Sequence, residues 1–213
     1  MKIALINEDS QADKNGLIYS VLKEEAEKKG HTVQNYGMYS EKDEHEINYI
    51  QLGVIASILL ASEAVDFVVT GCGTGQGASM SCNAFSNITC GYVNTPLDAY
   101  LFTQVNAGNV ISMPFGQGFG WGAEINLRYV FEKLFAQEFG GGYPEIYAEG
   151  ESRSRKAMYT NIKFASQYPV LEAYKNMDRE YLKSILDYKE FKELFFANAK
   201  DNEVTDYIKS LFD

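Results

Sequence analysis

The chain has 213 residues, of which 46% are hydrophobic, and this suits one globular core with an appendage. The formal net charge of −10 argues against nucleic acid or an anionic membrane as a partner, and the longest apolar run, 54–61, is far too short to span a bilayer. Three cysteines are an odd number, which disfavours a disulfide framework. With no signal-peptide pattern after Lys2, we expect a cytoplasmic protein.

Strand and helix patterns alternate along the first 137 residues. Short apolar runs predict strands at 3–6, 32–36, 67–70, 89–93 and 110–113. Apolar residues at helical spacing predict helices at 17–29, 49–61, from Pro96 onward, and at 123–137. The alternation predicts an α/β fold, a Rossmann-like three-layer sandwich with a five-stranded parallel sheet. Ligands of such sheets bind beyond the carboxyl ends of the strands.

Two segments carry more apolar surface than one face of a sheet can bury. Helix 49–61 is apolar on nearly every side, which predicts burial against the sheet or a partner subunit. After a predicted linker at 140–154, the tail from Lys156 is helical and charged, and its aromatic residues are typical of a packing face. We expect this tail to dock on the core or on a neighbouring subunit. The predicted domains are a core at 1–145 and a helical C-terminal extension at 146–213.

A glycine-rich turn after the third predicted strand is the most informative segment. Strand 67–70 is predicted to end at Gly71, and the turn that follows carries the thiol of Cys72 and the hydroxyl of Thr74. A helix that begins near this turn presents free N–H groups and its positive dipole end, which favour an anion and a thiolate. A base beside N–H donors suits the removal of a proton next to a carbonyl group. The alternative is a tight turn with an inert, buried cysteine.

Other polar residues are predicted to meet Cys72 at the same edge of the sheet. The 7–11 loop follows the first strand, and Asn94 follows the fourth. The pair Glu8 and Asp9 is either a solvated loop or a source of hydrogen bonds to substrate. Glycines and aromatics alternate at 115–122, so that Trp121 belongs either to a pocket wall or to a tight interface loop. With two histidines and no paired Cys-x-x-Cys, the sequence offers no ligand set for zinc or iron.

Residues 71–77, with the sequence GCGTGQG, resemble the active-site turn of the type B ribose-5-phosphate isomerase and galactose-6-phosphate isomerase family. Weaker matches follow in the family's order, at 1–5, 30–37, 106–110 and 138–142. The resemblance implies that Cys72 moves a proton between adjacent carbons without any metal or organic cofactor. Thr74 and the nearby N–H groups would then stabilise an enediolate. It also implies a homodimer or homotetramer with a shared active site.

We therefore predict that Cys72 and Thr74 are catalytic. The predicted substrate contacts, drawn from the loops and from the resemblance, are Asn7, Asp9, Ser10, Gly73, Gly75, Gln76, Gly77, Asn94, Asn106 and Trp121.

The chain departs from that family at three places. Glu8 and Asp9 stand where the family has an Asp-His pair, and Asn94 stands where it has a ring-opening histidine. Residues 142–147 hold no cation where the family binds phosphate, although Arg153 and Arg155 lie just beyond. A phosphate dianion needs cations or many N–H donors. The departures imply an unphosphorylated, open-chain substrate.

A branch of the family that isomerises 4-deoxy-5-ketouronate, a product of glycosaminoglycan degradation, resembles this chain most. The length, the glycine turn and the 118–122 stretch carry the resemblance. This branch implies a small sugar acid as the substrate. The alternatives are a ribose-5-phosphate or galactose-6-phosphate isomerase, and a non-catalytic module that binds sugar acids.

Overall fold

A computed structural model of the chain describes residues 1–43, 46–187 and 189–213. His45 and Tyr188 lie outside the described residues. The chain divides into two compact units, 1–155 and 156–213. Each of these units has a hydrophobic core of its own.

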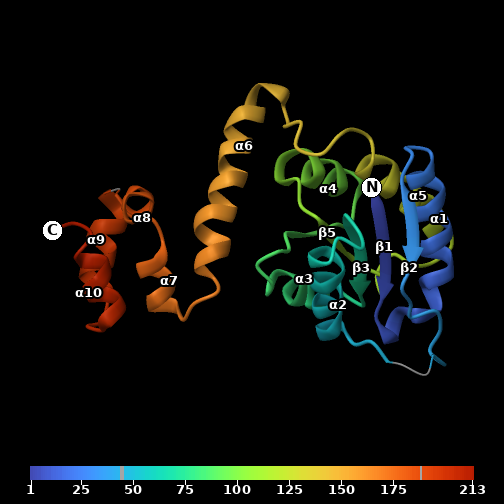
Figure 1. The fold of residues 1–213 in the computed structure, drawn as a ribbon, viewed down its shortest axis with the longest axis horizontal. Coiled ribbons are helices and arrows are strands. Elements are labelled where there is room, and N and C mark those ends of the chain that lie inside the picture. The colour runs from blue at the N-terminus through green and yellow to red at the C-terminus, as the bar shows by residue number, and fades with distance from the viewer. Residues whose placement is uncertain (44–45, 188) are drawn as a thin grey trace. The chain divides into compact units, whose positions relative to one another are not determined.

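The first unit contains a sheet of five parallel strands in the order β2-β1-β3-β5-β4 (Figure 1). The strands are β1 (Lys2–Asn7), β2 (Thr32–Asn35), β3 (Phe67–Cys72), β4 (Cys90–Tyr92) and β5 (Val110–Pro114). The predicted α/β fold with a five-stranded parallel sheet is therefore confirmed. The strand order reverses between β1 and β3, and sheets of this kind bind ligands at such a switch point.

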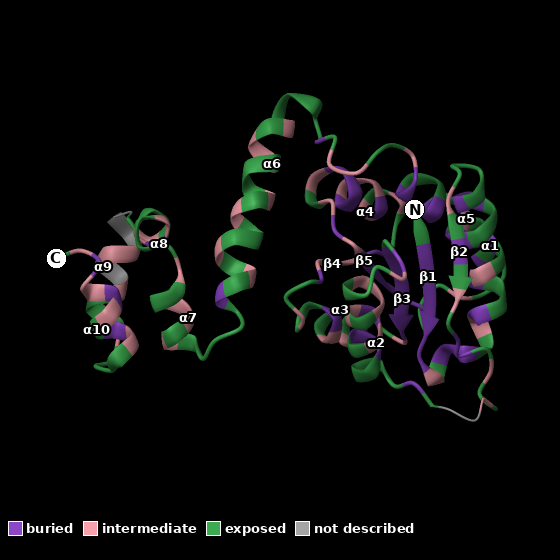
Figure 2. Cartoon of the chain, in the orientation of Figure 1, coloured by how far each residue is buried: buried purple, intermediate pink, exposed green. Residues whose placement is uncertain are grey.

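Helices cover both faces of the sheet, which makes three layers. One face packs against α1 (Asn15–Glu27), α4 (Pro96–Leu101) and α5 (Ala123–Leu134), and the other against α2 (Tyr49–Ala61) and α3 (Gln76–Asn83). Alternate residues of β1 serve the two cores, since Ile3 and Leu5 face one layer and Ala4 and Ile6 the other. Figure 2 shows that the central strands are buried along most of their length, and burial on both faces explains why they are rich in apolar residues.

Strand β3 does not end at Gly71, as the sequence predicted, but continues through Cys72. Gly71 lies opposite Met113 of β5, and Cys72 lies opposite Pro114. A Cβ atom at Gly71 would lie 2.3 Å from the Met113 carbonyl oxygen. Glycine is therefore needed here for the close approach of β5, and the strand carries Cys72 to the very edge of the sheet.

The predicted linker at 140–154 is wrong, because a short 3-10 helix (Glu145–Tyr147) and α6 (Ala148–Ala157) occupy much of it. The guanidinium of Arg155 donates to the carbonyl oxygens of Val105 at 2.7 Å and Gly140 at 3.2 Å. These bonds tie the end of the first unit to its core, so this unit extends past the boundary predicted at residue 145. The other 3-10 segment is Asp9–Lys14, and π-helical turns lie at Phe102–Asn106 and Met158–Lys163.

The second unit is helical, as predicted for the tail. Its helices are α7 (Val170–Asn176), α8 (Arg179–Leu186), α9 (Lys189–Asn198) and α10 (Glu203–Lys209). Leu182, Ile208 and Leu211 form its buried centre, and the rings of Phe191 and Phe195 stack with centroids 5.1 Å apart. Aromatic residues of the tail thus pack within this unit. In the described ranges, no helix is both long and apolar enough to cross a membrane.

Candidate active site

Glu8 and Cys72 leave the sheet side by side. Strands β1 and β3 run parallel, with Asn7 paired to Gly71. Glu8, which follows Asn7, therefore lies level with Cys72, which follows Gly71. Both lie at the carboxyl edge of the sheet, at the switch point of the strand order. Only 3% of Glu8 and 6% of Cys72 is exposed to solvent. A carboxyl group and a thiol are therefore brought together in a sheltered place.

Both residues line one cavity of about 810 Å³, a size typical of small-molecule sites. Ser10 follows Glu8 on one side, and Gly73, Thr74 and Gly77 follow Cys72 on the other. The remaining wall is mostly apolar and comes from α2, α3 and the chain just after α3: Tyr49, Ile50, Val54, Met80, Ser81, Ala84 and Phe85. Five residues of the predicted site thus share this cavity, namely Cys72, Thr74, Ser10, Gly73 and Gly77.

Strand β5 and the segment after it hold the glycine turn in place. Gly75 has a φ of 71°, in the left-handed region, and precedes the first residue of α3. Its carbonyl oxygen accepts from Ser112 Oγ at 2.7 Å, and that of Gly73 accepts from the Gly116 N–H at 2.9 Å. The N–H groups of the first turn of α3 have no partners within the helix. One of them, that of Gln76, donates to Thr74 Oγ1 at 3.3 Å, just before the helix. The predicted arrangement of strand, glycine turn and helix N-terminus is present.

Helix α2 supplies an apolar wall to the cavity. The ring of Tyr49 lies over Gly77, where a Cβ atom would be 2.7 Å from Tyr49 Cδ2. The next turn of α2 is equally close to α3, because a Cβ at Gly53 would lie 2.4 Å from the Ser81 carbonyl oxygen. Glycine at both positions lets the two helices touch, and this contact places Tyr49 beside the turn.

Glu8 belongs to a chain of hydrogen bonds. Its carboxylate accepts from the backbone N–H of Ser10 at 3.2 Å and from the Ser10 hydroxyl. Gln11 Nε2 donates to that hydroxyl oxygen at 2.9 Å, and Lys14 Nζ donates to Gln11 Oε1. Burial raises the pKa of Glu8, and a hydrogen bond to Asp9 raises it further. The same bond lowers the pKa of Asp9, so Glu8 takes up a proton more readily than Asp9 does.

Asn7 holds the chain after β1 in place through hydrogen bonds, and it is not among the residues that line the cavity. Its side-chain N–H donates to the Gln11 carbonyl oxygen at 3.1 Å, and its side-chain oxygen accepts from Asn15 at 3.1 Å. Asn7 is completely buried, and these bonds satisfy both ends of its amide. Its place at the end of β1 thus fixes Glu8 and the start of the 3-10 segment that contains Asp9 and Ser10.

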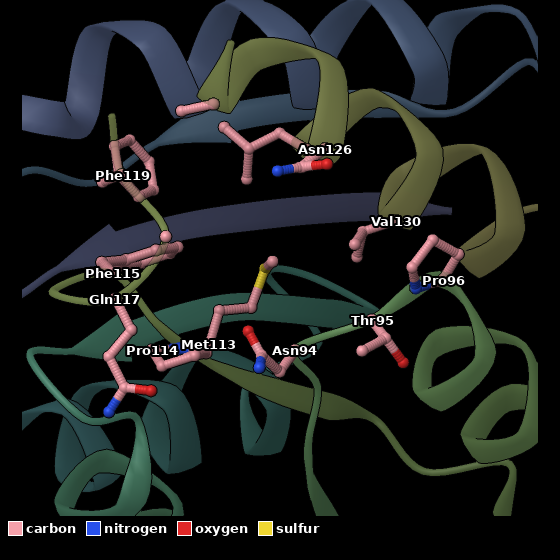
Figure 3. Close-up of a pocket in the computed structure, with 13 residues that line it drawn as sticks. Asn94, Thr95, Pro96, Met113, Pro114, Phe115, Gln117, Phe119, Asn126 and Val130 are labelled. Atoms are coloured by element: carbon pink, nitrogen blue, oxygen red, sulfur yellow. The ribbon is translucent and has the colours of Figure 1, made fainter. Parts of the chain in front are cut away.

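Asn94, Asn106 and Trp121 are not among the residues that line the Cys72 cavity. Asn94 follows β4, which β5 separates from β3, and it lines another cavity of about 280 Å³ with Met113 and Asn126 (Figure 3). Asn106 precedes β5 and so lies at the amino edge of the sheet. Trp121 is fully exposed. The substrate contacts of these three residues stay predictions.

The two arginines considered as anion clamps have other partners. Arg153 pairs with Glu149 one helical turn away, and Arg155 is bonded to two backbone carbonyls. Among the described residues that line the Cys72 cavity, none is a lysine or an arginine. In the same described part of the chain, no group of three or more His, Cys, Asp or Glu side chains gathers that could hold a metal ion.

The sequence left open whether Glu8 bonds to substrate and did not place it among the predicted site residues, and it assigned Tyr49 no role in the site. Glu8 could have been found from its position, since it is the first residue after a strand that neighbours the Cys72 strand. Tyr49 gave no comparable signal, because only the helix contact over Gly77 places it.

A family model described as Ribose/Galactose Isomerase matches residues 3–142, which include β1 through β5 and the whole glycine turn. The chain belongs to this family. A second model, described as Ribose-5-phosphate isomerase, matches residues 165–211 in the helical unit. The predicted family is confirmed, and with it the class of enzyme, an intramolecular oxidoreductase that isomerises sugars.

Two solved structures match nearly the whole chain. A 4-deoxy-L-threo-5-hexosulose-uronate ketol-isomerase complexed with a tartrate is 49% identical, covers 100% of both chains and has a TM-score of 0.76. A ribose-5-phosphate isomerase from Vibrio parahaemolyticus is 48% identical, covers 99% of both and has a TM-score of 0.75. A ribose 5-phosphate isomerase from Thermotoga maritima, 23% identical over 71% of this chain and 97% of its own, has a TM-score of 0.53 and shares the fold. None of the curated proteins matches the chain significantly.

Proposed function

We propose that this enzyme isomerises 4-deoxy-L-threo-5-hexosulose uronate, an open-chain sugar acid with one carboxylate and no phosphate. The observation that carries the proposal is the cavity itself, whose described lining contains Cys72 and Thr74 but no lysine or arginine. A phosphate dianion without cations there would lose its strongest binding partners. The full-length similarity to a ketol-isomerase of this keto-uronate supports the same substrate.

In the proposed mechanism Cys72 acts as the base. Its thiolate removes a proton from the carbon next to the carbonyl group, and the charge that develops on oxygen forms an enediolate. Thr74 and the N–H groups of the glycine turn stabilise that oxygen, and Ser10, Gly73 and Gly77 supply further contacts in the cavity. The proton then returns to the adjacent carbon. Because the net change is a shift of protons, we propose that the reaction needs no cofactor.

The substrate proposal predicts a clear order of activities. Purified protein will turn over the 4-deoxy-5-ketouronate with a higher kcat/KM than ribose 5-phosphate or galactose 6-phosphate, because only the latter two bring a phosphate group into a cavity without cations. Parallel assays with the three compounds at equal enzyme concentration measure this. If either sugar phosphate is the better substrate, the uronate assignment is wrong.

A phosphate isomerase is the second candidate. The observation that favours it is the near-equal identity to a structure named ribose-5-phosphate isomerase, 48% against 49%. For this function Arg153 or Arg155 would have to leave its present partner, or a neighbouring subunit would have to supply the cations.

We further propose a homodimer or homotetramer in which one subunit completes the Cys72 cavity of the next. Exposed apolar side chains gather on α2 and α3, namely Tyr49, Ile50, Val54, Ile58 and Met80. Apolar patches of this kind are rare on soluble monomers unless they bind something. The patch borders the cavity, so a second copy seated on it would close the site. Asn106, remote from Cys72 in its own chain, is our candidate for the residue that reaches across.

An Ile58→Glu variant tests this assembly. Ile58 is 61% exposed on α2 and does not line the cavity, so we expect the buried charge to shift the protein toward monomer and lower its activity per chain. Light scattering and assays at micromolar concentration measure both effects. Leu97→Glu is the matched control, because Leu97 is 63% exposed but lies on α4. A fully active monomer would refute the shared site.

A further inference from the structure

Ketol isomerisation has to move protons on oxygen as well as on carbon. The carbonyl oxygen gains a proton and the neighbouring hydroxyl loses one, and the thiol of Cys72 serves only the carbon atoms in the proposed mechanism. We infer that Glu8 transfers the protons of the two substrate oxygens while Cys72 transfers the proton of the carbons. This inference rests on the proposed function and adds a second proton-transferring residue to the same cavity.

The position of Glu8 carries the inference. Glu8 and Cys72 are the first residues beyond the paired Asn7 and Gly71, on adjacent parallel strands, and both line the cavity. The segment after Glu8 also touches the turn after Cys72, because Gln11 Nε2 lies 3.6 Å from the place of a Cβ on Gly73. A substrate held with its reacting carbon at Cys72 therefore has its oxygens within the space that Glu8 borders.

Burial and a neighbouring carboxylate favour the protonated form of Glu8. Burial and the carboxylate of Asp9 raise the pKa of Glu8, whereas the two hydrogen bonds from Ser10 lower it. Among the described residues that line the cavity, the other titratable groups are Cys72 and Tyr49, and Lys14 Nζ donates to Gln11 Oε1 nearby in the sequence. Enzymes often use two neighbouring carboxyl groups with different pKa values, one as the acid and the other as the base. In the inferred mechanism Glu8 is the acid of this pair.

The proton transfers balance without any oxidant or reductant. The Cys72 thiolate takes the proton from the hydroxyl-bearing carbon, the C–H electrons form a carbon–carbon double bond, and the carbonyl oxygen takes the proton of Glu8. Glu8, now a carboxylate, accepts the proton of the other hydroxyl as the new carbonyl group forms. The double-bond electrons then take the proton of the Cys72 thiol onto the adjacent carbon. Both residues return to their starting protonation states.

A purely structural role for Glu8 makes a different prediction. Glu8 caps the 3-10 segment Asp9–Lys14 through the N–H of Ser10. The amide oxygen of a glutamine can accept that bond as well, so a capping role alone would leave turnover nearly unchanged in Glu8→Gln. An acid that exchanges protons with the substrate cannot be replaced by an amide.

The first test is therefore Glu8→Gln. We expect kcat to fall by about 10²–10⁴-fold with little change in KM, the size of effect typical for loss of a positioned acid or base. The rate at which iodoacetamide labels Cys72 should stay near that of the wild type, which shows that the cavity is intact. Glu25→Gln is the matched control, because Glu25 is also buried but pairs with Lys28 and Arg128 at the surface of α1. Its kcat should not change.

The second test is the pH profile of Asp9→Asn. Since activity needs protonated Glu8, turnover by the wild type should fall as the pH rises through the pKa of Glu8. Asp9 raises that pKa, so its removal should move this fall to lower pH. The shift is independent of whether Glu8→Gln folds, and a capping role would not produce it.

The outcomes distinguish failure of the role of Glu8 from failure of the proposed function. Near wild-type kcat in Glu8→Gln, or an unmoved pH profile in Asp9→Asn, overturns the role of Glu8. If Cys72→Ala is inactive in the same assays, the proposed function survives that result. If the wild type isomerises none of the three test compounds, the proposed function fails and the role of Glu8 fails with it.

Discussion

Cys72→Ala is expected to lower kcat by about 10²–10⁴-fold while the protein stays folded. Cys72 stands at the end of β3, next to the N–H groups that begin α3, and it borders the cavity. The substitution removes only a sulfur atom at the cavity wall, so unfolding should be little affected. Steady-state assays and circular dichroism of the variant measure the two effects. A variant that keeps more than about a tenth of the wild-type rate would show that Cys72 is not the base.

Thiol labelling gives this prediction an independent control. Iodoacetamide should modify Cys72 before Cys82, and a bound sugar acid should protect it. A hydrogen bond to Cys90 and burial raise the pKa of Cys82, so that thiol stays protonated and unreactive. Cys90→Ala is the matched variant, because Cys90 is half-buried on β4 and does not line the cavity. It should keep full activity.

Gly71→Ala is expected to destabilise the protein and to displace Cys72. The new methyl group would lie 2.3 Å from the Met113 carbonyl oxygen and 2.6 Å from the Phe115 ring, so β3 and β5 would have to move apart. Overpacking of this kind costs about 1–3 kcal/mol, and about 2–4 °C in Tm per kcal/mol in a protein of this size. Thermal unfolding and the kcat of the variant measure both effects.

Gly120→Ala is the control for that substitution. A methyl group at Gly120 would meet no atom within 4 Å, and the backbone there has no positive φ. The variant should therefore unfold near the wild-type temperature. Equal stability of the two variants would mean that β3 and β5 tolerate separation, and the account of Gly71 would be wrong.

The apolar runs predicted the five strands and most helices. In each run the spacing of apolar residues matches either a strand or a helix, and turn residues mark its end. Helix α2 was predicted from its apolar residues with its observed bounds, Tyr49–Ala61, and in the structure Asn48 caps its start. The end of β3 was predicted two residues early because Gly71 was taken as a strand end. In the structure Gly71 serves a contact with β5, and nothing local in the sequence reports a contact between strands 40 residues apart.

Which residues form the site depends on the order of the strands in the sheet, and local sequence patterns do not reveal that order. The loops after β1 and β3 meet because these strands are neighbours, whereas β5 lies between β3 and β4 and keeps Asn94 apart from Cys72. The same order brings Glu8 level with Cys72. From the sequence, Arg153 and Arg155 were available to bind an anion. In the structure Arg155 donates instead to backbone carbonyls that come close only in the folded core.

The central claim is that this enzyme moves a proton, through Cys72, between two adjacent carbons of an open-chain keto-uronate. The most direct measurement is NMR spectroscopy of the product formed by the wild-type protein in D2O. A proton held by a thiol can exchange with solvent, so we expect deuterium on the receiving carbon of at least part of the product, and turnover by Cys72→Ala that is about 10²–10⁴-fold slower. Product free of solvent deuterium, together with near wild-type turnover by Cys72→Ala, would indicate direct transfer of the substrate hydrogen and would contradict this mechanism.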